Sequence, residues 1–576
     1  MSYRSLPYSP VLLGLLLLPS ACSSSEQALA DAWREDKSTT AKDAGIHDLN
    51  LGHLARVYEV DPETTPTLKD VVLRNVAEDV GGVLTSAADK NGVRKIRVVS
   101  CVDEGRVDQG RRVCTLKARA NAMDNGNFVF ADLAQGGTAV DDRAAEVMAY
   151  YHVQRAYDFV TSKAVGLFDV LPARHTQDGK AVPLTVVVNF RAPSASGPLK
   201  RTGRAMYFPQ EFGRMGMFAM EGLKGIEGDV LVFGQGNHTD FAYSGETAYH
   251  EFGHMAFTAL TGTYFYTYAD NFGMCHLNNV ISEGIADTFA WLISGHRTLG
   301  EYCDIESGKA GAYIRHADNK ARFPKDLVGL FLRDGQVLSG AHYEAFQLLR
   351  EKAKLDQHAF ARLLMKTLMS LAKYKGKISF AIYADEFLST ATSLGQGDHV
   401  KALRALFEAR GLYRPRAKDI TSFDGKAGVD HLLLIDGTDP MKGGAFMKTT
   451  RDGVPASMAT TFVQSFVDLP KGNSIIELAA TLDRHLTFPS DPSTLDVELL
   501  LRKDGPILYD VQQTPVTIDF DLAQKPTLAT VPSPRGSIRR ATWTLKGLQG
   551  GARYYRHIVN YGASGGSLRN LEVSIR

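Results

Sequence analysis

One short motif restricts the folds open to this chain more than any other feature. Residues 250–254 read His-Glu-Phe-Gly-His, so two histidines stand four positions apart. On an α-helix that spacing puts both imidazoles on one face, one turn apart, where they can hold a single metal ion. Ser244 is a favourable N-cap and Glu246 suits a first turn. We therefore expect a helix that begins after Ser244.

Residues 281–287 read Ile-Ser-Glu-Gly-Ile-Ala-Asp and complete the pattern. Catalytic zinc takes three protein ligands and keeps one position for water. Glu283, which follows His254 by 29 residues, is far enough along the chain for a second helix to bring it back as the third ligand. Asp287, one turn later, is expected to accept the free ring N–H of a ligating histidine. The sequence therefore predicts a Zn²⁺ site built from His250, His254 and Glu283.

Glu251 follows the first histidine directly. There a carboxylate can take a proton from metal-bound water and return it to a leaving amine. The flanks Ala248-Tyr249 and Met255-Ala256-Phe257 are apolar, which predicts a buried helix. The pattern thus favours a zinc-dependent peptidase with Glu251 as catalytic residue. One alternative is an amphipathic helix with paired surface histidines. Another is a structural lipoprotein with a chance motif, which requires Glu283 to lie far from both histidines.

The N-terminus has the features of a targeting segment. Arg4 precedes the apolar run 11–18, which is too short to span a bilayer. Small residues before Cys22 and three serines after it resemble a bacterial lipoprotein signal, although Pro19 stands where that family normally has Leu. The resemblance implies an exported protein, lipid-anchored in the cell envelope through Cys22. The alternative is cleavage near Ala21 and secretion.

The remaining cysteines fit an oxidising compartment. Without Cys22 there are four, which can pair in three ways. Cys101 and Cys114 flank a hairpin-like stretch with a Gly/Asp-rich turn, so we expect them to pair. Cys275 and Cys303 then lie on either side of the segment with the third ligand, and a bridge there would hold its helix. The alternative is four free buried thiols.

Composition and charge are ordinary for a soluble globular protein. The chain has 576 residues, 44% of them hydrophobic and 22% charged, and the net charge of +1 gives no basic surplus for nucleic acid. Its length suggests several domains. We expect a signal peptide at 1–22, a flexible tether at 23–45, a small β-rich domain or pro-region at 46–135, a peptidase domain at 136–414 and a C-terminal β-sandwich at 415–576.

Hydrophobic periodicity supports this division. Spacings of three and four predict helices, whereas short β-branched runs bounded by Gly, Pro or Asp predict strands. Helices are expected at 144–157 and within 341–412. Strands are expected at 94–100, 112–118, 128–130, 186–188, 230–233, 497–501, 516–520 and 557–561.

The motifs at 231–254 and 281–291 resemble those of the thermolysin and fungalysin group of gluzincin metallopeptidases. Residues 204–208 and 339–346 are similar to that family's Asn-Ala-aromatic and Ser-Gly-Ala segments, and the resemblance covers about 145–412. It implies an α+β, zincin-type domain with a mixed-sheet lobe and a helical lobe. It also implies zinc bound by His250, His254 and Glu283, with Glu251 as base and Asp287 behind the ligands. We expect a monomer acting on peptide or protein substrates.

Two departures from that family leave a second interpretation open. Arg204 stands where the family has its substrate-binding Asn, and no His precedes the Ser-Gly-Ala segment. His342, just beyond, is a candidate replacement for this transition-state His, although helix packing is favoured for it. Tyr266, with Tyr264 and Tyr268 beside it, is the candidate for the family's oxyanion-binding Tyr. The alternative function is a weak or inactive surface-binding lipoprotein that keeps the zincin scaffold.

Overall fold

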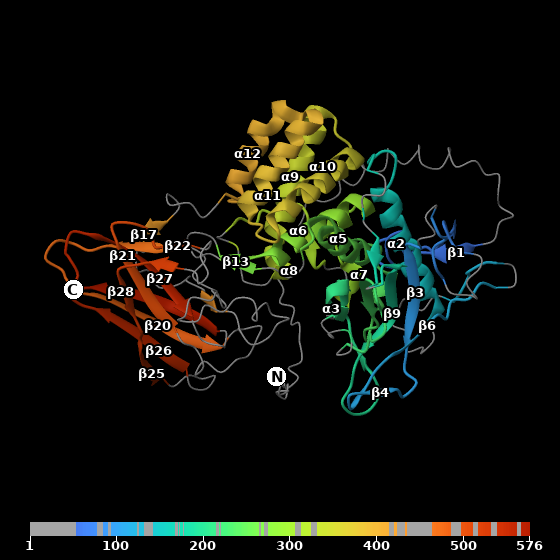
Figure 1. Cartoon of the computed structure of the whole chain (residues 1–576), viewed down its shortest axis with the longest axis horizontal. Helices are drawn as coiled ribbons and strands as arrows, with labels where there is room; N and C mark the ends of the chain where they lie inside the picture. The colour runs from blue at the N-terminus through green and yellow to red at the C-terminus, as the bar shows by residue number, and fades with distance from the viewer. Residues whose placement is uncertain are drawn as a thin grey trace.

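The computed structural model shows a mixed α+β chain, with a sheet and helices in its N-terminal part and two sheets at its C-terminal end (Figure 1). Among the described residues, no helix combines the length and hydropathy needed to cross a bilayer. The structure describes residues 53–413, except for 78–83, 90–93, 124–125, 132–141, 168–170, 172, 177, 215–217, 219–220, 264–266, 270–274, 306–312, 324–325 and 327–330, and residues 420–422, 432–434 and 464–576, except for 485–496, 511–516, 532–537 and 561–565.

A mixed sheet forms the first layer of the N-terminal part. Its strands are β3 (Ile96–Val102), β6 (Thr115–Lys117), β9 (Leu184–Ala192), β10 (Lys200–Arg201), β11 (Ala205–Phe208) and β12 (Val230–Gly234). They run in the order β11-β12-β9-β3-β6, and β10 pairs with the end of β9. The three central strands are parallel, whereas β6 and β11 are antiparallel edge strands. β12 and most of β9 are fully buried, as parallel strands covered by other layers are.

The predicted domain boundary at 135 does not separate two domains. β3 and β6 both come from residues 46–135, yet they belong to the same sheet as β9 and β12. Ala55, Val57 and Phe128 are also buried in one core with the helices that follow. The strand patterns at 94–100 and 112–118 were predicted correctly, but a local pattern cannot show which sheet a strand joins. Removing 46–135 as a pro-region would take two strands from this sheet.

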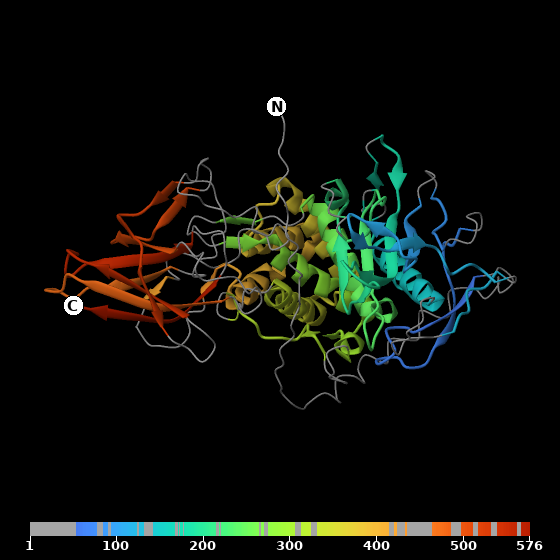
Figure 2. The same cartoon turned by 90° about the horizontal axis from the view of Figure 1, so that it is seen from below.

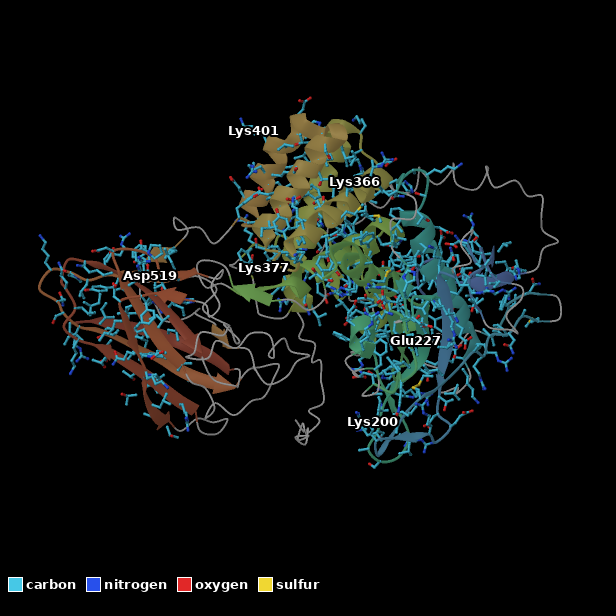
Figure 3. All side chains as sticks on the ribbon, viewed as in Figure 1. Lys200, Glu227, Lys366, Lys377, Lys401 and Asp519 are labelled. Carbon is cyan, nitrogen blue, oxygen red and sulfur yellow. A yellow bond between two sulfur atoms is a disulfide. The ribbon has the colours of Figure 1, made fainter. Side chains whose placement is uncertain are left out.

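The helices form the second layer. The longer ones are α2 (Arg143–Val160), α5 (Gly245–Thr261), α6 (Asn278–Ser294), α9 (Gln336–Ala353), α10 (Gln357–Leu371), α11 (Phe380–Ala391) and α12 (Val400–Ala409). α2 packs on β3 and β9, and α5 packs on α2, α6 and α10. Helices α9–α12 lie together in both views of the molecule (Figures 1 and 2). The exposed side chains of Lys366 on α10 and Lys401 on α12 lie on the outside of this group (Figure 3).

Several helices begin at the polar residues that the sequence offers as caps. Asp142, Ser244, Asp356 and Ser379 each accept a hydrogen bond from a backbone N–H in the first turn of the next helix. The structure confirms the helix predicted at 144–157, which is α2, with its bounds shifted by at most a few residues. It also confirms the helices predicted within 341–412.

Short elements connect these layers. Helices α3 (Gln210–Arg214), α7 (Glu301–Asp304) and α8 (Phe331–Asp334) are single turns. The two-stranded pairs are β1 (Leu54–Val57) with β2 (Lys69–Val72), β4 (Val107–Asp108) with β5 (Arg111–Arg112), β7 (Arg174–His175) with β8 (Ala181–Val182), β13 (Thr267–Ala269) with β14 (Cys275–Leu277), and β15 (Thr298–Leu299) with β16 (Arg315–His316).

The expected C-terminal β-sandwich is present. One sheet contains β17 (Thr421–Ser422), β19 (Ser465–Asp468), β27 (Arg553–Asn560), β21 (Val497–Lys503) and β24 (Leu522–Gln524). The other contains β18 (Leu432–Leu434), β28 (Gly566–Ile575), β20 (Ile476–Arg484), β26 (Ile538–Leu545) and β25 (Thr527–Val531). Leu499 and Ile558 from the first sheet share a buried core with Leu478 and Trp543 from the second. β22 (Leu508–Asp510) and β23 (Thr517–Asp519) form a separate hairpin.

Candidate metal centre

Helix α5 carries the two histidines, and its ends follow from local sequence. The Ser244 side chain accepts a hydrogen bond from Thr247 N at 3.2 Å, which caps the first turn. At the other end Gly262 adopts a left-handed conformation with φ 67°, which favours glycine. Between these ends His250 and His254 lie one turn apart, and their Nε2 atoms are 3.1 Å from each other. The predicted helical spacing is confirmed.

Helix α6 brings the third predicted ligand to the same place. Glu283 Oε2 lies 3.4 Å from His250 Nε2, and its Oε1 lies 3.4 Å from His254 Nε2. One ligand atom from each residue falls within 4.8 Å of the others, so the group could hold a metal ion. The alternative, in which Glu283 lies far from the histidines, is wrong.

Glycines allow α6 to approach both of its neighbours closely enough for this. A Cβ atom at Gly253 of α5 would lie 2.6 Å from the Cα atom of Ala286 on α6. On the other side of α6, a Cβ atom at Gly284 would lie 2.6 Å from the Cβ atom of Leu338 on α9. No ordinary side chain fits at such distances, so the helix that carries Glu283 is held between two close contacts.

Two residues orient the histidines from behind. Asp287 Oδ1 lies 3.0 Å from His250 Nδ1, and Ser282 Oγ lies 2.8 Å from His254 Nδ1. With these oxygens close to the Nδ1 atoms, both Nε2 atoms lie on the side of Glu283, which is the arrangement that metal-binding histidines require. Asp287 was predicted for this role. Ser282 was not, because a serine one position before the glutamate has no distinctive signal in the sequence.

Arg315 is a further residue of the centre that the sequence did not predict. It lies on β16, which the pairing Leu299↔Arg315 holds beside β15 after α6 ends. Its Nη1 donates to Glu283 Oε2 at 2.8 Å, and its Nε lies 3.2 Å from Asp287 Oδ1. Arg315 belongs to no motif and follows Glu283 by 32 positions. Only the fold shows that its guanidinium faces these two carboxylates.

Burial and neighbouring charges set the protonation of the centre. Burial alone would raise the pKa of Glu283, but His254 and His250 outweigh it and hold the pKa well below its usual range. Burial and Arg315 would lower the pKa of His250, whereas Asp287 and Glu283 raise it to about 9. Without a metal ion the cluster therefore keeps a proton on His250, which an incoming cation must displace.

Glu251 is buried on α5 and 6% exposed. Burial raises the pKa of its carboxyl, and the nearby imidazoles of His254 and His250 oppose that rise. A carboxyl with a raised pKa beside a group of metal ligands suits a residue that must both take up and release a proton. The side chain of His254 is 15% exposed, compared with 8% for that of His250.

His342 does not belong to the centre. It is fully buried, with Nδ1 2.8 Å from Thr288 Oγ1 and Nε2 2.8 Å from the hydroxyl of Tyr383, and it stacks on Phe387. Burial lowers its pKa to about 3. The structure contradicts the transition-state role and supports the packing role that was favoured. Tyr266 and Tyr264 lie outside the described residues.

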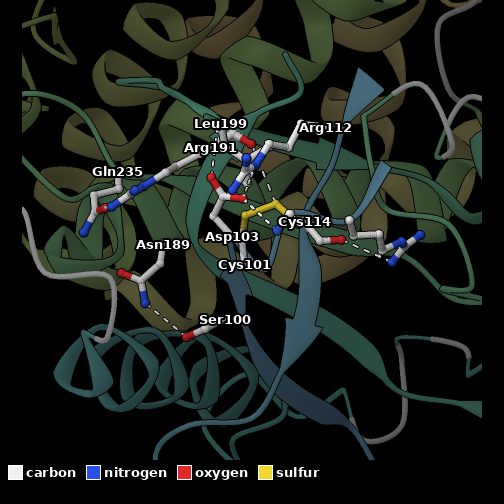
Figure 4. The surroundings of a disulfide bond; sticks show 11 residues. Ser100, Cys101, Asp103, Arg112, Cys114, Asn189, Arg191, Leu199 and Gln235 are labelled. Carbon is white, nitrogen blue, oxygen red and sulfur yellow. Dashed lines mark hydrogen bonds and ion pairs between the residues drawn. A yellow bond between two sulfur atoms is a disulfide. The ribbon is translucent and has the colours of Figure 1, made fainter. Parts of the chain in front are cut away.

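One of the two expected disulfides is present. Cys101 on β3 pairs with Cys114, directly before β6, with 5.0 Å between their Cα atoms (Figure 4). A salt bridge of 2.5 Å between Arg112 and Asp103 lies beside it.

The expected Cys275–Cys303 bridge is wrong, because Cys303 is a free, buried thiol on α7. It lies 3.2 Å from the Thr247 hydroxyl, at the start of α5. The side chain of Cys275 lies outside the described residues, as do the predicted signal peptide, Cys22 and the tether at 23–45.

Comparison of the sequence with known protein families gives no match, and comparison with curated proteins gives none either. The structure by itself establishes a mixed α+β fold and a group of residues that could hold a metal ion.

Proposed function

We propose that the chain is a zinc-dependent metallopeptidase of the gluzincin type, acting on peptide or protein substrates. The observation that carries this proposal is the convergence of His250, His254 and Glu283, with Glu251 buried on the same helix as the two histidines. Two imidazoles and one carboxylate are a ligand set typical of catalytic Zn²⁺.

The arrangement of donor atoms fits such an ion. Three donors come from two helices, and the groups behind them fix the orientation of both imidazoles. When bound, zinc supplies a Lewis acid that polarises a carbonyl group and lowers the pKa of water. Zinc is favoured over Mg²⁺ or Ca²⁺ because those ions prefer oxygen ligands.

Within the proposed reaction, Glu251 takes a proton from the attacking water and passes it to the leaving amine nitrogen. Its burial favours this exchange, because the buried carboxyl binds a proton more readily than a carboxyl exposed to water does.

Arg315 places a guanidinium group beside the ligands, where an N–H can donate to a substrate carbonyl oxygen. This gives the site a hydrogen-bond donor that His342 does not provide.

We further propose that the protein is exported and lipid-anchored in the cell envelope through Cys22, with secretion as the alternative. The disulfide between Cys101 and Cys114 supports an oxidising compartment.

The C-terminal β-sandwich would bind substrate, cell wall or a partner, since its core is separate from that of the helices and sheet around the proposed active site.

The proposal is tested by metal analysis and peptidase assays on the same preparations. Purified protein should contain about one zinc per chain and cleave casein. Glu251→Gln should keep the zinc but lose about 10²–10⁴-fold in rate, the range typical of a general base. Glu408→Gln, an exposed change on α12, is the matched control and should leave the rate unchanged.

The second candidate function is the weak or inactive surface-binding lipoprotein. One observation favours it. His342 is the described histidine nearest in sequence to the position where the family has its transition-state His, and it is buried among packed helices. The same assays separate the two functions. Zinc bound at wild-type level without Glu251-dependent cleavage would support the binding protein and contradict the peptidase.

A further inference from the structure

The guanidinium group of Arg315 contacts two of the three proposed metal ligands. Nη1 donates to Glu283 Oε2 at 2.8 Å, and Nη2 lies 3.4 Å from His250 Nε2. These are the atoms that would bind the metal ion. The positively charged side chain of Arg315 thus contacts the same donor atoms that a metal ion would use.

The fold holds this guanidinium firmly in place. Nη1 also donates to the Leu332 carbonyl oxygen at 3.2 Å, and Nε lies 3.2 Å from Asp287 Oδ1. On the backbone, Ile314 N donates to Leu299 O at 3.0 Å, which fixes the β16 segment beside β15. The side chain of Arg315 is only 15% exposed. Its position is therefore set by the β15–β16 pair and α8 as well as by the ligands.

The negative charges of two buried carboxylates explain why a positive charge is needed beside Glu283 and Asp287. Glu283 and Asp287 are buried carboxylates, and a buried charge is costly unless it is paired. Arg315 pairs with both. A divalent ion bound to Glu283 would supply that pairing itself. It would also lie within a few ångströms of the guanidinium, because zinc binds imidazole nitrogen at roughly 2.0–2.1 Å.

We propose that Arg315 is a resident counter-cation that a metal ion must displace from Glu283. By this means the residue keeps the metal-free centre folded and lowers the affinity of the centre for metal. Asp287 and the Leu332 carbonyl oxygen keep hold of Arg315 when Glu283 is released. Arg315 thus acts on the metal ion through Glu283 as a positioning residue. The inference rests on the metal centre of the proposed function but not on peptidase activity.

The test is a zinc titration against a chromophoric chelator at neutral pH. Compared with wild type, Arg315→Gln should lower the Kd for zinc at least tenfold. Arg315→Lys keeps the charge on a shorter stem that cannot form the same pair of contacts, and should give an intermediate Kd. Arg410→Gln is the matched control, because Arg410 is also buried and bonds Glu344 at 2.9 Å away from the centre. It should leave the Kd unchanged.

Thermal unfolding gives a second readout. The metal-free Arg315→Gln protein should have a lower Tm than wild type, and zinc should raise its Tm by more than it raises that of wild type. Arg410→Gln should lower the Tm with and without zinc by the same amount. If Arg315→Gln folds only when zinc is present, that result supports the proposal.

The outcomes are distinct. If wild-type protein binds no zinc, the proposed metal centre itself fails. If wild type binds zinc and Arg315→Gln binds it equally or more weakly, only the counter-cation role is overturned. Should Arg315→Gln fail to fold under either condition, Arg315→Lys decides, and a Kd no lower than that of wild type overturns the role.

Discussion

Asp287 acts on the proposed metal ion only through His250. Its Oδ1 lies 3.0 Å from His250 Nδ1, and it is 1% exposed. We expect Asp287→Asn to weaken zinc binding about 10–100-fold, the usual effect of removing such a partner, because the imidazole loses the carboxylate that makes it basic. Chelator competition measures this directly. Asp385→Asn, which changes an exposed carboxyl on α11, should have no effect, and equal affinity in both variants would contradict the role of Asp287.

His342 gives a prediction about pH. Thr288 Oγ1 donates to Gly284 O, so it accepts the Nδ1–H of His342, and Nε2 then accepts from Tyr383. The ring is neutral when folded, with a pKa lowered by burial from 6.5 to about 3. The stability it contributes is complete above pH 6.5. As the pH falls from there toward 3, the unfolded chain binds a proton that the folded chain does not, and stability falls by up to about 1.4 kcal/mol per pH unit.

His342→Phe removes this titration. We expect its Tm to fall less steeply than that of wild type between pH 6.5 and 3, although its Tm at neutral pH should be lower, because the Tyr383 hydroxyl loses its partner at a cost of about 1–3 kcal/mol. Its kcat relative to bound zinc should be unchanged. An unchanged acid slope, or a specific loss of kcat, would contradict the packing role.

At the scale of elements, the contact between α5 and α6 decides whether the ligands meet. Gly253→Ala places a methyl group 2.6 Å from the Cα atom of Ala286, so the helices must separate. We expect this overpacking to cost about 1–3 kcal/mol, even though alanine favours the helix by up to about 1 kcal/mol. Zinc affinity should also fall, since Glu283 moves away from His250 and His254. Denaturant unfolding and chelator competition measure the two effects.

Gly397→Ala is the control for that change. Gly397 has φ −54°, and its nearest contact to an added Cβ is Thr392 Cγ2 at 4.0 Å. Stability should stay the same or increase slightly, with zinc affinity unchanged. If Gly253→Ala behaved in the same way, close packing of α5 on α6 would not be what positions Glu283.

The sequence predicted those parts of the centre that depend on local geometry. His250 and His254 share a helix face, and Ser244 caps that helix, because both facts follow from spacing within a few residues. Glu283 and Asp287 were predicted from one further motif. Arg315 was missed because its position depends on the β15–β16 pair and α8, which no nearby pattern reveals.

The same limit applies to the fold. The strands at 96–102 and 115–117 were predicted from β-branched residues, but β9, which pairs with β3 and joins both strands to the larger sheet, lies more than 60 residues further along the chain. Sheet membership is a tertiary property, so the boundary at 135 was misplaced. The C-terminal β-sandwich was predictable because its strand patterns recur between turn residues and its described strands pair only with one another, although partners such as β18 and β28 lie far apart in the chain.

At the scale of the whole molecule, the mixed sheet predicts which fragments fold. A fragment 136–414 lacks β3 and β6 and leaves β9 with an exposed edge. We expect it to be insoluble or unfolded, whereas 53–414 should fold and bind zinc as full-length protein does. Circular dichroism and zinc titration of the two fragments test this. A folded, zinc-binding 136–414 would restore residues 46–135 as a removable pro-region.

The core around the metal centre and the core of the sandwich also predict how the full chain unfolds. One core joins buried residues from Ala55 to Leu412, and the other joins residues from Val467 to Ile558, with no described residue common to both. Calorimetry of the full chain should therefore show two transitions. A ligand stabilises only the folded unit that binds it, so a zinc chelator should lower the transition of the metal-binding part and leave that of the sandwich unchanged. The isolated fragment 415–576, which contains every strand of the two sheets, should reproduce the transition of the sandwich. A single transition that the chelator shifts as a whole would mean that the sandwich and the metal-binding part unfold together.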